Sequence, residues 1–136
     1  MVMFHYTTET AASIQDAIAA LETFLKEEQF GVLWRFNLRE KLKEKGFDFD
    51  REYVILEVCN PAEANRVVSE NVMAGYFLPC KIVVYEADGK TKIGMPKATV
   101  FMNMLEDDAL TGIAADVEAR LIGCINRVAN LQHGNR

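Results

Sequence analysis

The sequence of 136 residues is poor in residues that loosen or cross-link a chain, with 8 glycines, 3 prolines and 3 cysteines. So little glycine and proline excludes a flexible linker or a fibrous repeat, and no internal repeat or low-complexity tract is present. Charged residues interrupt every hydrophobic stretch, so no run approaches the roughly 18 apolar residues of a membrane span. Because 50% of the residues are hydrophobic, disorder is also excluded. We therefore expect a single domain over residues 1–136 with no membrane contact.

Basic residues are in deficit, since 15 Lys and Arg stand against 20 Asp and Glu, for a net charge of -5. Broad capture of a phosphate backbone needs the opposite balance, so we expect no nucleic-acid partner. The most basic segment, residues 35–51, has acidic residues between its basic ones and is typical of a solvent-exposed face. The first residues lack the basic start and apolar core of a signal peptide. We therefore expect a cytoplasmic protein.

Motifs for metals and cofactors are missing as well. The sequence has no C-x-x-C, H-x-H or H-E-x-x-H motif, and its two histidines lie near opposite ends of the chain. A metal site needs more ligands than two thiolates. The glycines match neither a P-loop nor a dinucleotide-binding fingerprint. We therefore predict no metal and no cofactor.

The hydrophobic pattern predicts alternating strands and helices. A period of two predicts a strand over 32–38, aromatic, β-branched or continuous apolar residues predict strands near 3–8, 53–58 and 81–86, and a tight turn before it predicts a strand near 91–95. Helical spacing predicts two long helices, one starting at Ile14 and one over 110–128, and two shorter helices over 39–45 and 61–73. Residues 96–105 fit neither period. This order predicts an α+β fold, a two-layer sandwich with a mainly antiparallel sheet of about five strands and both long helices on one face.

Glycines mark the expected ends of these elements. We expect Gly31, Gly46 and Gly75 to end helices, because glycine tolerates the left-handed conformation found there. Asp88-Gly89 is typical of a tight hairpin turn. In the second strand, alternation places Val32, Trp34, Phe36 and Leu38 on one side.

Two of the three cysteines are the candidate catalytic residues. Cys59 ends one predicted strand and Cys80 begins another, so antiparallel pairing would bring their thiols to one edge of the sheet. Asn60 caps a helix that starts at Pro61, and the positive end of that helix would lower the pKa of Cys59 if its sulfur points that way. Free cysteines are more often small buried residues, so both roles stay open. Cys124 lies on the apolar stripe of the last helix and belongs to the core.

A short aromatic segment is the candidate ligand-binding region. Tyr76, Phe77 and Leu78 come after a glycine that ends a helix and before Pro79, so part of the segment should lie on a loop. Aromatic residues exposed on a loop indicate contact with a partner or ligand. We predict binding roles for Asn60, Tyr76, Phe77 and Pro79.

At Cys59-Asn60-Pro61 and at Gly75-Tyr76-Phe77-Leu78-Pro79-Cys80, the chain resembles the bacterial and archaeal family called domain of unknown function 302. The opening Tyr6-Thr7-Thr8-Glu9, the segment Phe30-Gly31-Val32-Leu33 and the acidic start of the last helix agree with that family. The resemblance covers most of the chain. It implies an α+β fold of the TATA-binding-protein-like type, often a homodimer, and no established activity.

Two functions fit these observations. The first, which we favour, is a non-catalytic homodimeric module for ligand binding or interaction, in which a second copy or a small apolar ligand covers the sheet face that the helices leave open. The second is a thiol-dependent enzyme or sulfur-handling protein that uses Cys59 and Cys80. The sequence alone leaves open whether the protein is an enzyme.

Overall fold

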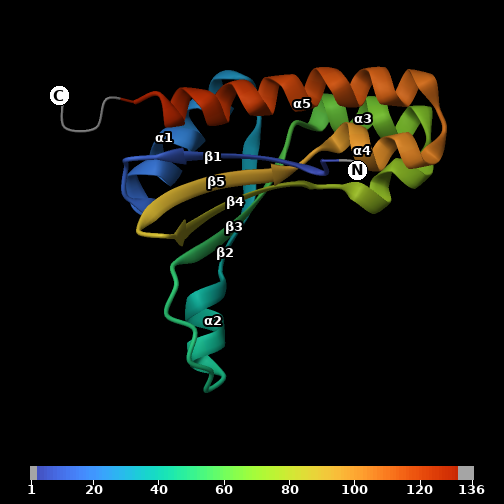
Figure 1. The fold of residues 1–136 in the computed structure, drawn as a ribbon. Coiled ribbons are helices and arrows are strands. Elements are labelled where there is room, and N and C mark those ends of the chain that lie inside the picture. The colour runs from blue at the N-terminus through green and yellow to red at the C-terminus, as the bar shows by residue number, and fades with distance from the viewer. Residues whose placement is uncertain (1–2, 132–136) are drawn as a thin grey trace.

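The computed structural model describes residues 3–131 and places all its strands in one sheet. In chain order the elements, with η for a 3₁₀ helix, are β1 (His5–Thr10), α1 (Ile14–Glu27), β2 (Gly31–Asn37), α2 (Leu38–Glu44), β3 (Tyr53–Cys59), α3 (Pro61–Glu70), η1 (Val72–Phe77), β4 (Cys80–Ala87), β5 (Lys90–Pro96), α4 (Ala98–Met102), η2 (Asn103–Leu105) and α5 (Asp108–Ala129). The five strands follow the order β1-β5-β4-β3-β2, and every neighbouring pair is antiparallel. The two long helices, α1 and α5, lie on the same face of the sheet (Figure 1). The predicted α+β sandwich is therefore confirmed.

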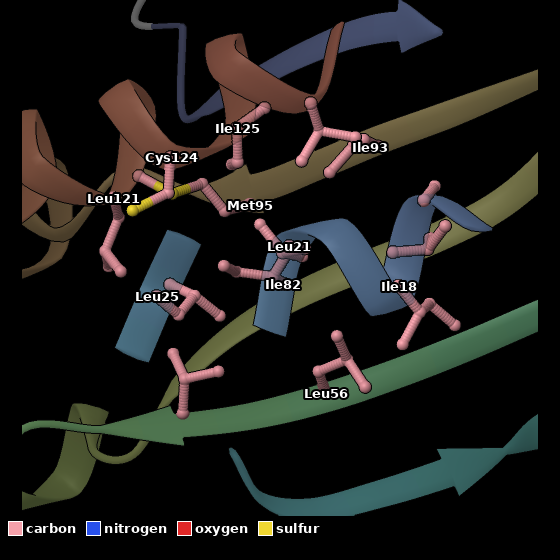
Figure 2. Packing of buried hydrophobic residues seen from close by; sticks show 14 of the residues in the cluster. Ile18, Leu21, Leu25, Leu56, Ile82, Ile93, Met95, Leu121, Cys124 and Ile125 are labelled. Carbon is pink, nitrogen blue, oxygen red and sulfur yellow. The ribbon is translucent and has the colours of Figure 1, made fainter. Parts of the chain in front are cut away.

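The main core lies between the sheet and the two long helices (Figure 2). Alternation along β3 turns Val54, Leu56 and Val58 toward the helices, where each is buried. Leu21 of α1 and Leu121 of α5 pack into the same cluster. Fully burying one such side chain contributes about 1.5–3 kcal/mol, so this layer provides much of the stability. None of the helices among residues 3–131 is both long and apolar enough to span a membrane.

A second, smaller cluster lies beyond one end of the sheet, between α3, η1, α4 and α5 (Figure 1). Its buried residues are Val67, Ala74, Met102, Leu110 and Ala114. This cluster adjoins the point where β3 ends and β4 begins, and it positions the candidate site. Residues 96–105, which fit neither period, form the end of β5, the short α4 and η2.

The second strand differs from the prediction. A bulge between Val32 and Trp34 interrupts the pairing of β2 with β3. Val32 pairs with the inward-facing Val58, whereas Trp34 pairs with Glu57 on the open face. The extra residue in a bulge shifts the alternation by one position, so the prediction that Val32 and Trp34 share a side is wrong. Leu38, expected on that same side, already belongs to α2.

Two of the three glycine stops are also wrong. After α1, Gln29 takes the left-handed conformation with φ 66°, and Gly31 begins β2. After α3, Asn71 is extended and its side chain accepts a hydrogen bond from the next helical turn, so Gly75 lies inside η1. The two helices therefore end without glycine, α1 through the left-handed backbone of Gln29 and α3 through the extended Asn71, whose side chain accepts from the Met73 amide. Gly46, at φ 89° after α2, is confirmed.

The predicted tight turn at Asp88-Gly89 is confirmed. Asp88 and Gly89 turn the β4–β5 hairpin with φ 56° and 74°, and Asn37 caps α2 by accepting a bond from the Glu40 amide at 3.0 Å. None of the residues of α2 is buried. This helix extends away from the sheet, beyond the end of β2 (Figure 1).

Candidate functional site

A narrow apolar slot opens where β3 ends, and it has a volume of about 30 Å³. Ala64 of α3, Ala98 of α4 and Ala114 of α5 line it. Because alanine carries only a methyl group, the three helices leave a space between them that larger side chains would fill. Val67 and Val117 also line this slot.

A wider groove of about 280 Å³ lies beside the slot. Its wall is formed by consecutive residues of η1 and the loop after it, Tyr76, Phe77, Leu78 and Pro79, and by Phe101 and Met102 of α4. The Phe77 and Phe101 rings contact each other at a centroid distance of 5.8 Å. Charged residues at the groove are Glu57 and Lys81, whose carboxylate and ammonium lie 3.4 Å apart.

The predicted ligand-binding residues divide between these two spaces. Tyr76, Phe77 and Pro79 line the groove, and Tyr76 is 80% exposed. Asn60 lines the slot, but its side chain is already engaged. Its Oδ1 accepts from the backbone amides of Ala62 and Glu63, and its Nδ2 donates to a backbone carbonyl of the turn after α1. Asn60 is therefore buried as a helix cap, as its position before Pro61 predicts.

The structure brings Cys59 and Cys80 to the same slot. The expected antiparallel pairing of β3 and β4 is present, with Cys80 opposite Val58. Both cysteines are free thiols. Burial, together with the neighbouring Cys59, raises the pKa of Cys80 to about 11. Cys80 therefore carries its proton at neutral pH and is a poor nucleophile.

Cys124 is a core residue, as its place on the apolar stripe predicts. It is 2% exposed, and its thiol donates to the Phe24 carbonyl at 3.5 Å. Burial is the main cause that raises the pKa of its thiol. Within residues 3–131, no group of three or more His, Cys, Asp or Glu side chains could hold a metal ion.

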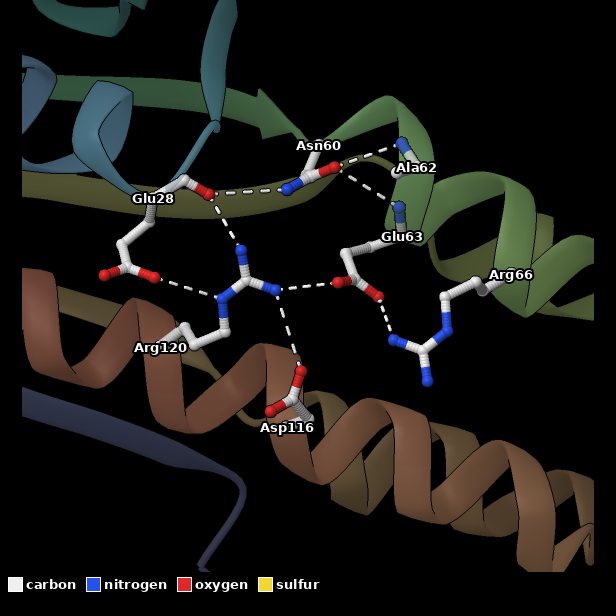
Figure 3. A network of polar contacts seen from close by, with 7 residues as sticks. All are labelled: Glu28, Asn60, Ala62, Glu63, Arg66, Asp116 and Arg120. Atoms are coloured by element: carbon white, nitrogen blue, oxygen red, sulfur yellow. Dashed lines mark hydrogen bonds and ion pairs between the residues drawn. The ribbon is translucent and has the colours of Figure 1, made fainter.

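An ion-pair network that no sequence motif indicates lies beside the slot and centres on Arg120 of α5 (Figure 3). The Arg120 Nε donates to Glu28 Oε1 at 3.1 Å, Nη1 to Glu63 Oε2 at 2.7 Å, and Nη2 to the Glu28 carbonyl at 2.8 Å. Asp116, one turn earlier in α5, lies 3.6 Å from the guanidinium. Arg120 thus joins α5 to the ends of α1 and α3, next to Phe30, whose ring centroid lies 5.2 Å away.

The network keeps the Arg120 side chain charged beside the slot. Burial by itself would lower the pKa of Arg120, but hydrogen bonds to Glu28 and Glu63 raise it, so the guanidinium stays charged. The Glu63 carboxylate binds both Arg120 and Arg66. In the described part of the chain, no buried side-chain nitrogen or oxygen lacks a hydrogen-bond partner. The slot therefore offers an occupant apolar contact rather than free polar groups.

Comparisons with known proteins agree with this fold. The family model described as Domain of unknown function DUF302 matches residues 6–128. Among solved structures, the chain is similar to the crystal structure of the uncharacterized conserved protein DUF302 from Bacillus stearothermophilus. The two are 56% identical, the match covers 93% of this chain and 99% of that chain, and the TM-score is 0.91. No curated protein matches the chain.

Proposed function

Because this chain belongs to the DUF302 family, a domain of unknown function, membership assigns no activity, and we propose from the site itself that the protein is a non-catalytic binding module. The groove beside η1 takes a small apolar ligand. The single observation that carries this proposal is the groove of about 280 Å³ with aromatic walls from Tyr76, Phe77 and Phe101. Small-molecule sites have volumes of roughly 300–1,000 Å³ and mainly apolar linings. This groove lies just below that range, which suits a small ligand.

The exposure of Tyr76 supports the same function. An aromatic ring that is 80% exposed contributes little to folding, and next to a groove it is placed to stack on a ligand. Aromatic pairs contribute about 0.5–1.5 kcal/mol beyond their buried area. Loss of the ring should therefore weaken binding about two- to tenfold.

The experiment is an NMR titration with indole as the probe. We expect saturable shifts of backbone amides in residues 76–81 and 98–102. Tyr76→Ala should raise the dissociation constant of indole two- to tenfold, whereas the control Phe47→Ala, which removes an exposed ring far from the groove, should not change it. Shifts confined to other surfaces, or none at millimolar indole, would overturn the proposal.

The alternative function, thiol chemistry, rests on the presence of Cys59 and Cys80 in one slot. The raised pKa of Cys80 argues against a thiolate there. Labelling with iodoacetamide at pH 7 discriminates between the two functions. Rapid alkylation of Cys59 or Cys80, much faster than that of Cys124, would favour the thiol enzyme, and equal, slow labelling of all three supports the binding module.

We also propose that the protein acts as a homodimer through its open sheet face. This face carries aromatic and β-branched residues from three adjacent strands, namely Trp34, Phe36, Tyr53, Ile55, Val83 and Tyr85. The Trp34 and Phe36 rings are stacked 5.0 Å apart, and Trp34 is 50% exposed. A continuous apolar patch of this kind is typical of an interaction surface. Light scattering at micromolar concentration should give a dimer that Trp34→Ala weakens, and a monomeric parent protein would contradict this proposal.

Two further expectations accompany this function. The three free cysteines support a reducing, cytoplasmic location, because disulfides persist in oxidising compartments. The order of elements, with one long helix after β1 and another after the β4–β5 hairpin, supports a TATA-binding-protein-like fold. Such a likeness assigns no DNA-binding role.

A further inference from the structure

We infer that the ligand of the groove is an unbranched alkyl carboxylate, whose tail enters the slot and whose carboxylate binds Lys81. This inference rests on the proposed function of the groove and names the class of its ligand. Three observations carry it: the shared wall between groove and slot, the apolar lining of the slot, and the position of Lys81.

Four residues line both the groove and the slot. These are Leu78, Cys80, Ala98 and Met102. Ala98 contributes one methyl group, and Met102 has an unbranched side chain that changes rotamer easily. A methylene chain can therefore pass from the groove to the slot, whereas a ring stays in the groove.

The slot favours an apolar occupant over water. Asn60 and Glu63 are the lining residues with polar side-chain oxygens or nitrogens, and their hydrogen bonds are already made with the helix cap and with Arg120. A water molecule needs two to four polar partners and roughly 10–15 Å³ of space. A slot of about 30 Å³ therefore holds about two or three methylene-sized groups. These groups gain apolar contact there, whereas water would lack hydrogen-bond partners.

The charge at the groove selects the head group. Lys81 is about half exposed, and its ammonium lies 3.4 Å from Glu57 Oε2. An ammonium has three donors, so Lys81 can bind a ligand carboxylate and still contact Glu57. Glu57 is less exposed, with 23% of its side chain accessible, so the cation is the more accessible charge. The carboxylate therefore complements the groove better than an amine does.

The experiment measures the affinity of n-alkyl carboxylates from butanoate to decanoate by NMR or calorimetry. Affinity should rise about fourfold for each methylene that enters the slot, from about 0.8 kcal/mol per buried methylene. The rise should stop after two or three methylenes, when the slot is full. A matching series of alkyl amines should bind more weakly, and Lys81→Gln should weaken the carboxylates without changing the corresponding alcohols. Amines that bind more tightly than carboxylates would overturn the head-group assignment.

Ala64→Leu tests the slot directly, because Ala64 lines the slot and not the groove. We expect it to abolish the chain-length dependence while indole still binds the groove. Ala62→Leu, on the exposed side of the same helix, is the matched control and should leave both unchanged. If Ala64→Leu fails to fold, Ala64→Val replaces it. The NMR shifts of the Val117 methyl groups in the parent protein then also report whether the alkyl tail enters the slot. A parent protein that binds indole but shows no chain-length dependence would refute the slot, whereas one that binds neither would refute the groove itself.

Discussion

Removing the guanidinium of Arg120 should destabilise the protein more than removing any other exposed ion pair of α5. Arg120→Met keeps the apolar stem of the side chain and deletes three hydrogen bonds to Glu28 and Glu63, together with the contact to the Phe30 ring. A hydrogen bond to a charged group contributes about 1.5–3 kcal/mol. The Arg120 side chain is 26% exposed, so solvent screens part of the combined contribution of these hydrogen bonds.

The partners of Arg120 limit the loss further. Glu63 keeps its bond to Arg66 at 2.6 Å, and the Glu28 carbonyl keeps the Asn60 amide at 3.4 Å. Neither group is left without a partner, so the larger penalty of an isolated buried charge does not apply. We expect Arg120→Met to lower the free energy of unfolding by about 2–3 kcal/mol.

Arg127 provides a matched control on the same helix. It also pairs with a glutamate of α1, Glu27 at 2.7 Å, and its guanidinium also lies over a ring, 3.9 Å from the centroid of Phe24. Its side chain and that of Glu27 are about half exposed, so Arg127→Met should cost about 0.5–1 kcal/mol. The two variants thus share chemistry and differ in burial and in the number of partners.

Urea unfolding followed by far-ultraviolet circular dichroism measures the free energy of unfolding of both variants. Both are measured at one protein concentration, because association would add to stability. Unchanged denaturant slopes are required for the comparison. Equal losses in the two variants, or a loss below about 1 kcal/mol for Arg120→Met, would refute the argument that the network joins α1, α3 and α5.

Local signals predicted the fold well because they act over a few residues. The cap at Asn60 and the turn at Asp88-Gly89 depend on neighbouring atoms only. The glycine stops failed where another residue could perform the same task, as Gln29 does after α1. The bulge in β2 was not predictable, because the strand alternates apolar and polar residues both with and without the one-residue shift in pairing.

The site was predictable in part for the same reason. Antiparallel pairing of two strands was enough to place Cys59 and Cys80 at one end of the sheet. The partners of Arg120 are 57 and 92 residues away in sequence, so no spacing along the chain indicates them. The slot likewise depends on three helices meeting at alanines, a property of tertiary packing rather than of any one segment.

Three more predictions test other parts of this account. Gly94→Ala should destabilise the protein by about 1–3 kcal/mol through overpacking, because a Cβ there would lie 2.7 Å from Thr7 Oγ1. Gly112→Ala in α5 is the control, since a Cβ there meets open space. It should stabilise the protein by about 0.5–1 kcal/mol in the same urea assay. Asn60→Ala should cost about 1–2 kcal/mol through loss of the α3 cap, and no change in thermal midpoint would contradict that role. The last prediction concerns alkaline pH, where the pKa of Cys80 is raised from 9.0 to about 11 in the folded protein. Between these values the unfolded chain releases the thiol proton and the native chain retains it, so the native state binds more protons and stability falls as pH rises. Cys80→Ala lacks this contribution, so the difference in unfolding free energy between the parent protein and Cys80→Ala should decline as pH rises from 8 toward 11. Parallel stability curves over that range would show that the Cys80 thiol is not buried as the structure places it.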